Sequence, residues 1–427
     1  MRKSAQPEDS PAGEWDVVVI GGGPAGMMAA GRAAERGARV ILLEKNASLG
    51  RKLLITGGGR CNVTNAELDT RMLLAKFKES GKFLFSPFSE FAVKDTLDFF
   101  HTRGMPTKEE AGQRVFPLAN TAHAVWDVLV DYMRESGVEV MLNAPVKKVI
   151  IKDGRIDQLE LKGSRTIRAR SYILATGGKS HPETGSTGDG YAWLRELGHK
   201  VVEEGGALVP IRTVESWGKR AAGVALKDAK ITLYQNEVKQ SEQRGKVLFT
   251  HVGLSGPGIL NMSREIGELL KYGPLDVELD LLPHMGYEKV NAALQSLLKE
   301  HHTKKIKNAL DALVSPALCP VVLQLAEIDA DTPCNSVKRE QRIRLMKILK
   351  HIRMGVKDLL GMDKAVITAG GVDLAEVDFK TMRSRKCDNL YLVGDILNIE
   401  RPSGGYSLQL CWTTGFVAGS SAAHTKS

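Results

Sequence analysis

A chain of 427 residues with 43% hydrophobic residues can bury a large core, which argues against a disordered protein and favours two domains over one. No stretch reaches the roughly 18 apolar residues of a membrane-spanning helix, so we expect a cytoplasmic protein without a membrane span. The net charge of +9 allows an anionic partner. Much of the positive excess, however, lies at helix-like spacings between Lys304 and Arg353, which is typical of a solvated helix face. We therefore expect no nucleic-acid partner.

The N-terminal residues and the cysteines exclude further classes. Residues 1–15 are polar and charged without an apolar run, which predicts a flexible lead. The five cysteines are far apart, odd in number and form no CxxC pair, so the sequence predicts neither a disulfide framework nor a metal site.

The first predicted elements form a βαβ unit. An apolar β-branched run over Asp16–Ile20 precedes a helical stretch over Pro24–Gly37, and a second strand is predicted over Arg39–Glu44. Units of about this size place their two parallel strands side by side, with a right-handed crossover. The pattern predicts the start of a doubly wound α/β domain.

The α/β pattern of the sequence is interrupted by short alternating strands and then by helices, and it resumes near the end of the chain. A third strand is predicted over Tyr172–Ala175, and a strand at Leu390–Val393 and a helix over Tyr406–Ala423 end the chain. Between them we expect an inserted domain. The predicted boundaries are 16–199 and 364–427 for the two parts of the first domain and 200–363 for the insert, which is barrel-like over 200–284 and helical over 285–363.

The strongest motif is a GxGxxG turn between the first strand and its helix. Gly21 permits a tight turn, Gly23 lets the backbone approach a pyrophosphate, and Gly26 allows close packing of helix on strand. Glu44 ends the second strand, where a carboxylate can accept hydrogen bonds from a ribose diol and would repel a 2′-phosphate. An ordinary glycine turn with a salt-bridged Glu is the structural alternative, and this spacing favours a dinucleotide.

Features farther along the chain indicate FAD rather than NAD. Asp395 follows a strand and could bind a polyol such as ribityl, which NAD does not have. Ala175 and Thr176 begin a second glycine turn, at the sheet edge where ligands of open α/β sheets bind. Cys61 has no cysteine nearby, so we interpret it as structural or as a flavin contact rather than a redox thiol.

Six segments together resemble the BaiN/YhiN-like flavoproteins, the family that includes aminoacetone oxidase and bile-acid dehydro-reductases. The resemblance covers nearly the whole chain and is carried by IGGGPAGMMAA, GRKLLITGGGRCNVTN, ATGGKSHPETGSTGDGY, LFTHVGLSGPGIL, ITAGGV and LVGDILNIERPSGGYSLQLCWTTG. It implies a Rossmann-like FAD-binding domain of the glutathione-reductase type, made discontinuous by an inserted β-barrel and helical bundle. By this resemblance the FAD site comprises Gly21, Gly23, Ala25, Gly26, Glu44, Lys45, Arg51, Lys52, Asn62, Val146, Ala175, Thr176, Gly394, Asp395, Gly404, Gly405 and Tyr406.

This sequence departs from the family pattern near the expected flavin ring. Asp395 stands where Glu is usual, Asn398 where Asp is usual and Ser407 where Asn is usual, and Arg401 with Pro402 changes the same turn. The departure at Asp395 preserves the carboxylate. Because Asn398 and Ser407 lie close to where the flavin ring is expected, the resemblance by itself does not carry the particular substrate of a relative over to this chain.

The sequence predicts an FAD-dependent oxidoreductase that transfers a hydride through its flavin to or from a small-molecule substrate. The first hypothesis is NAD(P)H-driven reduction of an enone- or steroid-like substrate. Because there is no second strand–GxGxxG–helix unit, NAD(P)H would bind only transiently. The alternatives are a flavin amine oxidase that produces peroxide and a flavoprotein that binds RNA or a protein partner without turnover. His251 is the candidate acid or base, although a structural role is the commoner one. No pattern indicates an oligomeric state.

Overall fold

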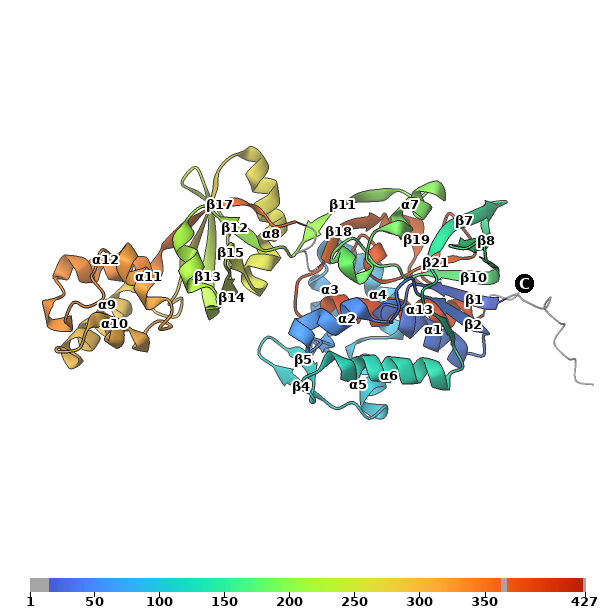
Figure 1. The fold of residues 1–427 in the computed structure, drawn as a ribbon, viewed down its shortest axis with the longest axis horizontal. Coiled ribbons are helices and arrows are strands. Elements are labelled where there is room, and N and C mark those ends of the chain that lie inside the picture. The colour runs from blue at the N-terminus through green and yellow to red at the C-terminus, as the bar shows by residue number, and fades with distance from the viewer. Residues whose placement is uncertain (1–14, 362–366, 425–427) are drawn as a thin grey trace, which may run out of the picture. The chain divides into compact units, whose positions relative to one another are not determined.

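The computed structural model describes residues 15–361 and 367–424, and its contacts divide the chain into two compact units (Figure 1). The first unit joins Met1–Gly206 to Ile367–Ser427, and the second is Ala207–Val366. The insert expected from residue 200 thus begins later, because β11 (Val201–Ala207) pairs with β18 (Ile367–Val372) in a two-stranded sheet. Its expected end at 363 lies outside the described residues, as does the expected lead except for Trp15.

A seven-stranded sheet forms the centre of the first unit, in the order β19-β20-β21-β10-β1-β2-β6. Its parallel part pairs β1 with β2 and β10, β2 with β6, and β10 with β21. The apolar runs of the sequence are buried, as expected for strands covered on both faces. This sheet confirms the predicted doubly wound α/β fold. The strands are β1 (Trp15–Ile20), β2 (Val40–Leu43), β6 (Glu139–Met141), β10 (Ala169–Leu174), β19 (Val377–Asp378), β20 (Arg383–Ser384) and β21 (Leu390–Leu392).

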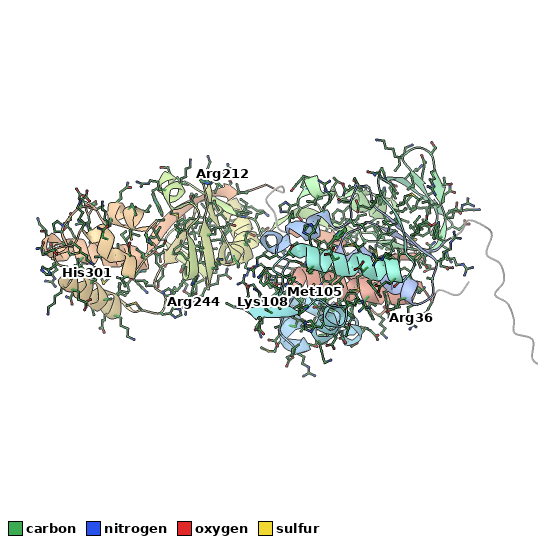
Figure 2. All side chains as sticks on the ribbon, turned by 60° about the horizontal axis from the view of Figure 1, so that its bottom comes forward. Arg36, Met105, Lys108, Arg212, Arg244 and His301 are labelled. Atoms are coloured by element: carbon green, nitrogen blue, oxygen red, sulfur yellow. The ribbon has the colours of Figure 1, made fainter. Side chains whose placement is uncertain are left out.

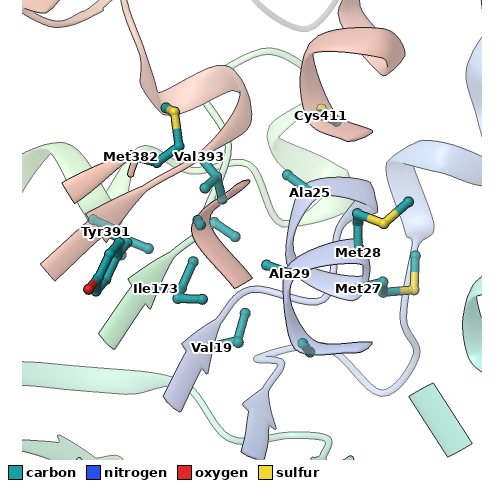
Figure 3. Close-up of a cluster of buried hydrophobic side chains, with 14 of the residues drawn as sticks. Val19, Ala25, Met27, Met28, Ala29, Ile173, Met382, Tyr391, Val393 and Cys411 are labelled. Atoms are coloured by element: carbon teal, nitrogen blue, oxygen red, sulfur yellow. The ribbon is translucent and has the colours of Figure 1, made fainter. Parts of the chain in front are cut away.

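Two helices far apart in sequence pack closely in this unit. Helix α1 (Pro24–Glu35) follows β1, and α13 (Tyr406–Ala422) is the last helix. A Cβ at Gly415 or at Gly419 would lie 2.5 Å from the carbonyl oxygen of Ala25 or of Ala29, respectively, so only glycine allows this approach. Figure 3 shows part of the apolar core of this unit, with Ala25, Met28 and Ala29 of α1, Val19 of β1 and Cys411 of α13. The N- and C-terminal parts of the chain therefore share one core.

Shorter elements complete the first unit. Two three-stranded sheets are formed by β3 (Thr64–Asn65), β5 (Arg114–Pro117) and β4 (Thr107–Glu110), and by β7 (Val146–Lys152), β8 (Arg155–Leu161) and β9 (Thr166–Ile167). The remaining helices are α2 (Arg51–Ile55), α3 (Thr70–Ala75), α4 (Gly81–Glu90), α5 (Val93–Thr102), α6 (Ala122–Glu135) and α7 (Asp189–Glu196). Among the residues that the structure describes, no helix combines the length and apolar character needed to cross a membrane.

The second unit contains the expected barrel and helical part, around its own apolar core. Six antiparallel strands close the barrel in the order β12-β15-β14-β13-β16-β17. They are β12 (Ile211–Thr213), β13 (Ala225–Gln235), β14 (Val238–Phe249), β15 (Gly253–Ser255), β16 (Leu275–Asp280) and β17 (Ile352–Leu359). Helix α8 (Pro257–Leu269) packs on β14, and α9 (Tyr287–Glu300), α10 (Ile306–Ala309), α11 (Cys319–Leu325) and α12 (Arg339–Lys350) form the helical part.

The prediction that residues 285–363 are all helical is wrong at its end. After α12, the chain forms β17, which pairs with β12 and β16 and closes the barrel. Ile352, Met354 and Val356 are buried in alternation with more exposed residues, a period of two that belongs to a strand. The helix that precedes this short run is rich in arginine and lysine, and its helical pattern obscured the alternation of the strand. The helices are therefore an insertion within the barrel.

Candidate functional site

The glycine turn after β1 leaves room for a ligand at the start of α1. Gly21 has φ +108°, and a Cβ there would lie 2.5 Å from the carbonyl oxygen of Ala175. A Cβ at Gly26 would lie 1.9 Å from the carbonyl oxygen of Gly21. A Cβ at Gly23, in contrast, would have no atom within 4 Å, and α1 begins after it without a side-chain cap. The helix N-terminus is thus open to an anionic group such as a pyrophosphate.

Glu44 is held rigidly beside this turn, directly after β2. One carboxylate oxygen accepts a hydrogen bond from the Gly22 amide at 2.8 Å. The other accepts from the Asn46 amide at 2.7 Å and from Asn46 Nδ2 at 2.8 Å. A carboxylate has about four acceptor positions, so about one remains for a ribose hydroxyl. Its position and its free lone pair fit the role predicted from the motif.

The cations expected near Glu44 have protein partners. Lys45 Nζ lies 2.5 Å from Thr187 Oγ1 and 2.7 Å from a carboxylate oxygen of Asp189. Arg51, at the start of α2, is exposed and donates to Asn46 Oδ1 at 3.1 Å. Val146, the other residue expected here, is the first residue of β7. Two residues before it, the Ala144 amide donates to the Glu44 carbonyl oxygen at 2.9 Å, which brings the start of β7 close to the segment that follows β2.

Two buried polar atoms indicate a missing polar partner. Thr176 Oγ1, after β10, and Asn62 Oδ1, in the loop before β3, are buried without a hydrogen-bond partner in the described part of the chain. Such atoms are costly to leave unsatisfied, and a polar ligand bound at this edge of the sheet would satisfy them. Both residues were expected to contact FAD. Together with the open space at Gly23, they make the site suitable for this dinucleotide.

Asp395 lies after β21 and between two cations. Its carboxylate forms an ion pair with Arg401, and its second oxygen lies 3.6 Å from Lys52 Nζ. Lys52 Nζ also donates to Ser180 Oγ at 2.5 Å. Burial alone would raise the pKa of Asp395, but the positive charges of Arg401 and Lys52 hold that pKa below its usual value. Asp395 is therefore an anion at neutral pH.

The segment that starts α13 approaches β3. Gly405 has φ +104°, and a Cβ there would lie 2.3 Å from the carbonyl carbon of Thr64. Asn65 Nδ2 donates to the Gly404 carbonyl oxygen at 3.3 Å. The Tyr406 ring is buried edge-on to Phe77, with ring centroids 5.9 Å apart. Packing against β3 thus explains why Gly405 must be glycine, and Tyr406 offers a ligand chiefly its backbone.

The cofactor candidates gather at one edge of the sheet. Most of them follow the carboxyl ends of the parallel strands β1, β2, β10 and β21, or begin the helix after such a strand, and Gly394 lies beside Ala25. Ligands of open α/β sheets bind at this edge. His251 is exposed between β14 and β15 and belongs to the second unit, whereas the cofactor candidates belong to the first.

Three residues that hold this site together were not among the expected cofactor residues: Asn46, Ser180 and Arg401. Asn46 binds Glu44, Ser180 binds Lys52, and Arg401 binds Asp395. An available signal was the place of Arg401 six residues after Asp395, since a buried cation is usually paired with an acid. Asn46 is only two residues from Glu44, so that partnership is local, whereas Ser180 is 128 residues from Lys52.

The thiols near the site are buried rather than reactive. Cys61 and Cys411 are both free and buried. Burial raises the pKa of the Cys61 thiol to about 12, partly offset by a hydrogen bond with Thr56, and burial also raises the pKa of Cys411. A thiolate, the nucleophilic form, is therefore rare at neutral pH. This agrees with the interpretation of Cys61 as a structural or flavin-contact residue.

Comparison with known proteins gives full-length matches. The family described as HI0933-like protein Rossmann domain matches residues 15–421. A 3-dehydro-bile acid delta(4,6)-reductase of Clostridium scindens is 33% identical over 95% of this chain and 98% of its own length. A ribosomal RNA dihydrouridine synthase of Escherichia coli is 30% identical over 94% of this chain and 96% of its own length.

Solved structures with the same fold are flavoproteins and steroid dehydrogenases. A flavocytochrome c3 fumarate reductase has a TM-score of 0.54 at 16% identity and covers 97% of this chain and 78% of that chain. The 3-ketosteroid-delta4-(5alpha)-dehydrogenase of Rhodococcus jostii has a TM-score of 0.54 at 15% identity and covers 99% of both chains. At these identities the likeness shows a shared fold.

Proposed function

Because this chain belongs to the HI0933-like Rossmann family, which matches residues 15–421, we propose that it reduces a carbon–carbon double bond conjugated to a carbonyl group. Membership confirms the resemblance inferred from the six motifs, and the chain is an FAD-dependent oxidoreductase. One observation carries the proposal about the reaction. Two full-length relatives are named for a bile-acid reduction and for the synthesis of dihydrouridine.

These two reactions share their chemistry. A 3-dehydro bile acid with delta(4,6) unsaturation has double bonds conjugated to its 3-oxo group, and the double bond of uracil that becomes saturated in dihydrouridine is conjugated to a ring carbonyl. In both, a hydride adds to the carbon remote from the carbonyl and a proton adds to the adjacent carbon. The conjugated carbonyl accepts the negative charge between these steps.

FAD, when bound, supplies the hydride chemistry. The residues of the chain would bind and orient it. Glu44 would accept from a ribose hydroxyl, and the amides that begin α1 after Gly23 would hold the pyrophosphate. Thr176 Oγ1 and Asn62 Oδ1 would acquire the hydrogen-bond partners that they lack within the described residues.

We also propose NAD(P)H as the transient reductant and His251 as the proton donor. Histidine is the side chain whose ordinary pKa lies nearest neutrality, and His251 is exposed in the second unit. We expect H251N to slow substrate reduction while leaving flavin reduction by NAD(P)H at the wild-type rate. Equal loss in both half-reactions would show that His251 does not supply the proton.

The decisive experiment is an anaerobic titration of the purified, FAD-loaded protein with NADH and then NADPH. Bleaching of the oxidised-flavin absorption band, followed by its return on addition of a conjugated enone, would support the proposal. An intact band with NAD(P)H, together with amine-dependent peroxide production in air, would favour the amine oxidase instead. Failure to bind FAD at all would refute the assignment of the site.

The second candidate substrate is a uracil base within RNA. The second unit, residues 207–366, contains 24 Lys and Arg against 18 Asp and Glu, an excess of six of the nine net positive charges. Lys304, Lys338 and Arg339 of its helical part are exposed, and Figure 2 labels His301, which precedes Lys304 by three residues, and Arg244 on the barrel. An excess of exposed cations favours a phosphate backbone, with its many negative charges, over a small substrate with one negative charge or none.

Binding and product analysis distinguish the two substrates. An RNA substrate predicts a complex with a ribosomal RNA fragment whose affinity falls steeply with salt, and a gain of two hydrogens on one uracil after incubation with NAD(P)H. A K304E/R339E variant should weaken this complex without changing flavin reduction. Enone turnover with no salt-sensitive RNA complex would leave the small-molecule substrate as the function.

A further inference from the structure

Arg401 is a buried cation in the segment between β21 and α13. Its side chain is 1% exposed. Nη1 donates to the Ile399 carbonyl oxygen at 2.6 Å, Nε donates to Ser407 Oγ at 3.0 Å, and Nη2 donates to Asp395. Arginine is rarely buried without such partners. These three acceptors, on both sides of the turn that leads into α13, fix the guanidinium.

The cluster around Arg401 has one positive charge more than it has negative charges. Arg401 and Lys52 are the charged groups that act on the Asp395 carboxylate, which gives two cations and one anion. The nearest acid in sequence, Glu400, pairs with Lys78 at 2.9 Å on an exposed side of the segment. The Asp395 side chain is 14% exposed, so water screens this surplus charge weakly.

We propose that Arg401 is a positioning residue that fixes Asp395 and gives the cofactor site an uncompensated positive charge, which stabilises the anion of reduced FAD. The inference rests on the proposed FAD site, because Asp395 and the start of α13 are two of its expected segments. Reduction of neutral oxidised flavin by two electrons and one proton produces an anion. A fixed cation nearby favours that product and raises the midpoint potential.

A charge cycle at positions 401 and 395 tests the proposal in the FAD-loaded protein. R401Q removes the surplus charge, so its midpoint potential should be more negative than wild type. D395N leaves Arg401 and Lys52 unopposed, so its potential should be more positive. The double variant R401Q/D395N restores the surplus of one and should return close to wild type. Each single change should alter the reduction equilibrium at least tenfold, which is about 30 mV for two electrons.

The measurement is anaerobic equilibration with a redox dye at saturating FAD, with thermal unfolding recorded for each variant. R401K keeps the charge and should retain the wild-type potential. R103Q is the matched control, because Arg103 pairs with Glu35 and stacks on Phe99 and Tyr132, none of which is a candidate cofactor residue. Its potential should not change. If R401Q does not fold, D395N and the double variant still decide the question.

Two results would overturn the proposal: a wild-type potential in R401Q, or a double variant that shifts as far as either single variant. Either would show that Arg401 is structural only. If the wild-type protein binds no FAD, the proposed function itself fails. If it binds FAD and is reduced while the potentials do not follow the charge, only the role of Arg401 is refuted.

Discussion

Substitution of Gly23 by alanine separates cofactor binding from folding. Gly23 is the N-cap of α1, with φ −79° and ψ −179°, which an L-residue adopts without strain. A Cβ there has no atom within 4 Å, so nothing in the protein itself resists it. As a poorer N-cap than glycine, alanine lowers the free energy of unfolding by about 0.5–1 kcal/mol. By restricting the unfolded chain, it raises the free energy of unfolding by a similar amount, so the two effects nearly cancel. We expect the stability of the FAD-free protein to change by less than about 1 kcal/mol.

The effect on FAD should be much larger. The methyl group would occupy the space where the pyrophosphate approaches the amides of α1. If two hydrogen bonds to charged phosphate oxygens are lost, at about 1.5–3 kcal/mol each, binding weakens by about 3–6 kcal/mol. Since 1.4 kcal/mol is a factor of ten, the Kd should rise roughly 100- to 10,000-fold. Quenching of FAD fluorescence gives the Kd, and urea unfolding of the FAD-free protein gives the stability.

Gly286 provides a matched control for this substitution. It is the N-cap of α9 in the second unit, with φ −69° and ψ 168°, and a Cβ there also has no atom within 4 Å. G286A should leave both FAD affinity and stability near wild type. A G23A protein that folds normally and binds FAD with the wild-type Kd would refute the assignment of the open space at Gly23 to the pyrophosphate.

Three further predictions follow from the same residues. G26A should destabilise the FAD-free protein by several kcal/mol, because its Cβ would lie 1.9 Å from the Gly21 carbonyl oxygen; urea unfolding of G26A and wild type measures this, and equal midpoints would contradict it. The pKa of Asp395 is lowered in the folded state, so its carboxylate stabilises the folded protein fully above the unfolded pKa of about 3.9, and this stabilisation is lost as the pH falls through the folded pKa. D395N removes this group, so the stability of the variant should fall less than that of wild type below about pH 4, as urea unfolding at several pH values would show. Native protein at pH 7 should resist alkylation of Cys61 by iodoacetamide, because burial raises its pKa to about 12; rapid labelling detected by mass spectrometry would contradict this.

Local patterns in the sequence were enough to predict the dinucleotide turn. Gly21, Gly23, Gly26 and Glu44 lie within one βαβ unit, whose geometry depends on short-range sterics and strand pairing. In the structure the Glu44 carboxylate accepts a hydrogen bond from the Gly22 amide, at the position where the motif predicts a carboxylate. The interrupted first domain was predictable for a related reason, since apolar strand runs recur on both sides of a segment with a different texture.

The tertiary structure decided what depends on contacts between distant segments. Lys52 and Ser180, 128 residues apart, meet only after the sheet and its helices have assembled, and Asp395 joins them with Arg401. Likewise, β17 forms a strand because it pairs with β12 on one edge and with β16 on the other. A period of two over a few residues is a weak local signal, whereas hydrogen bonding on both edges and an apolar barrel interior determine its conformation. The motif thus shows where a dinucleotide binds, and the packed chain determines which charges surround it.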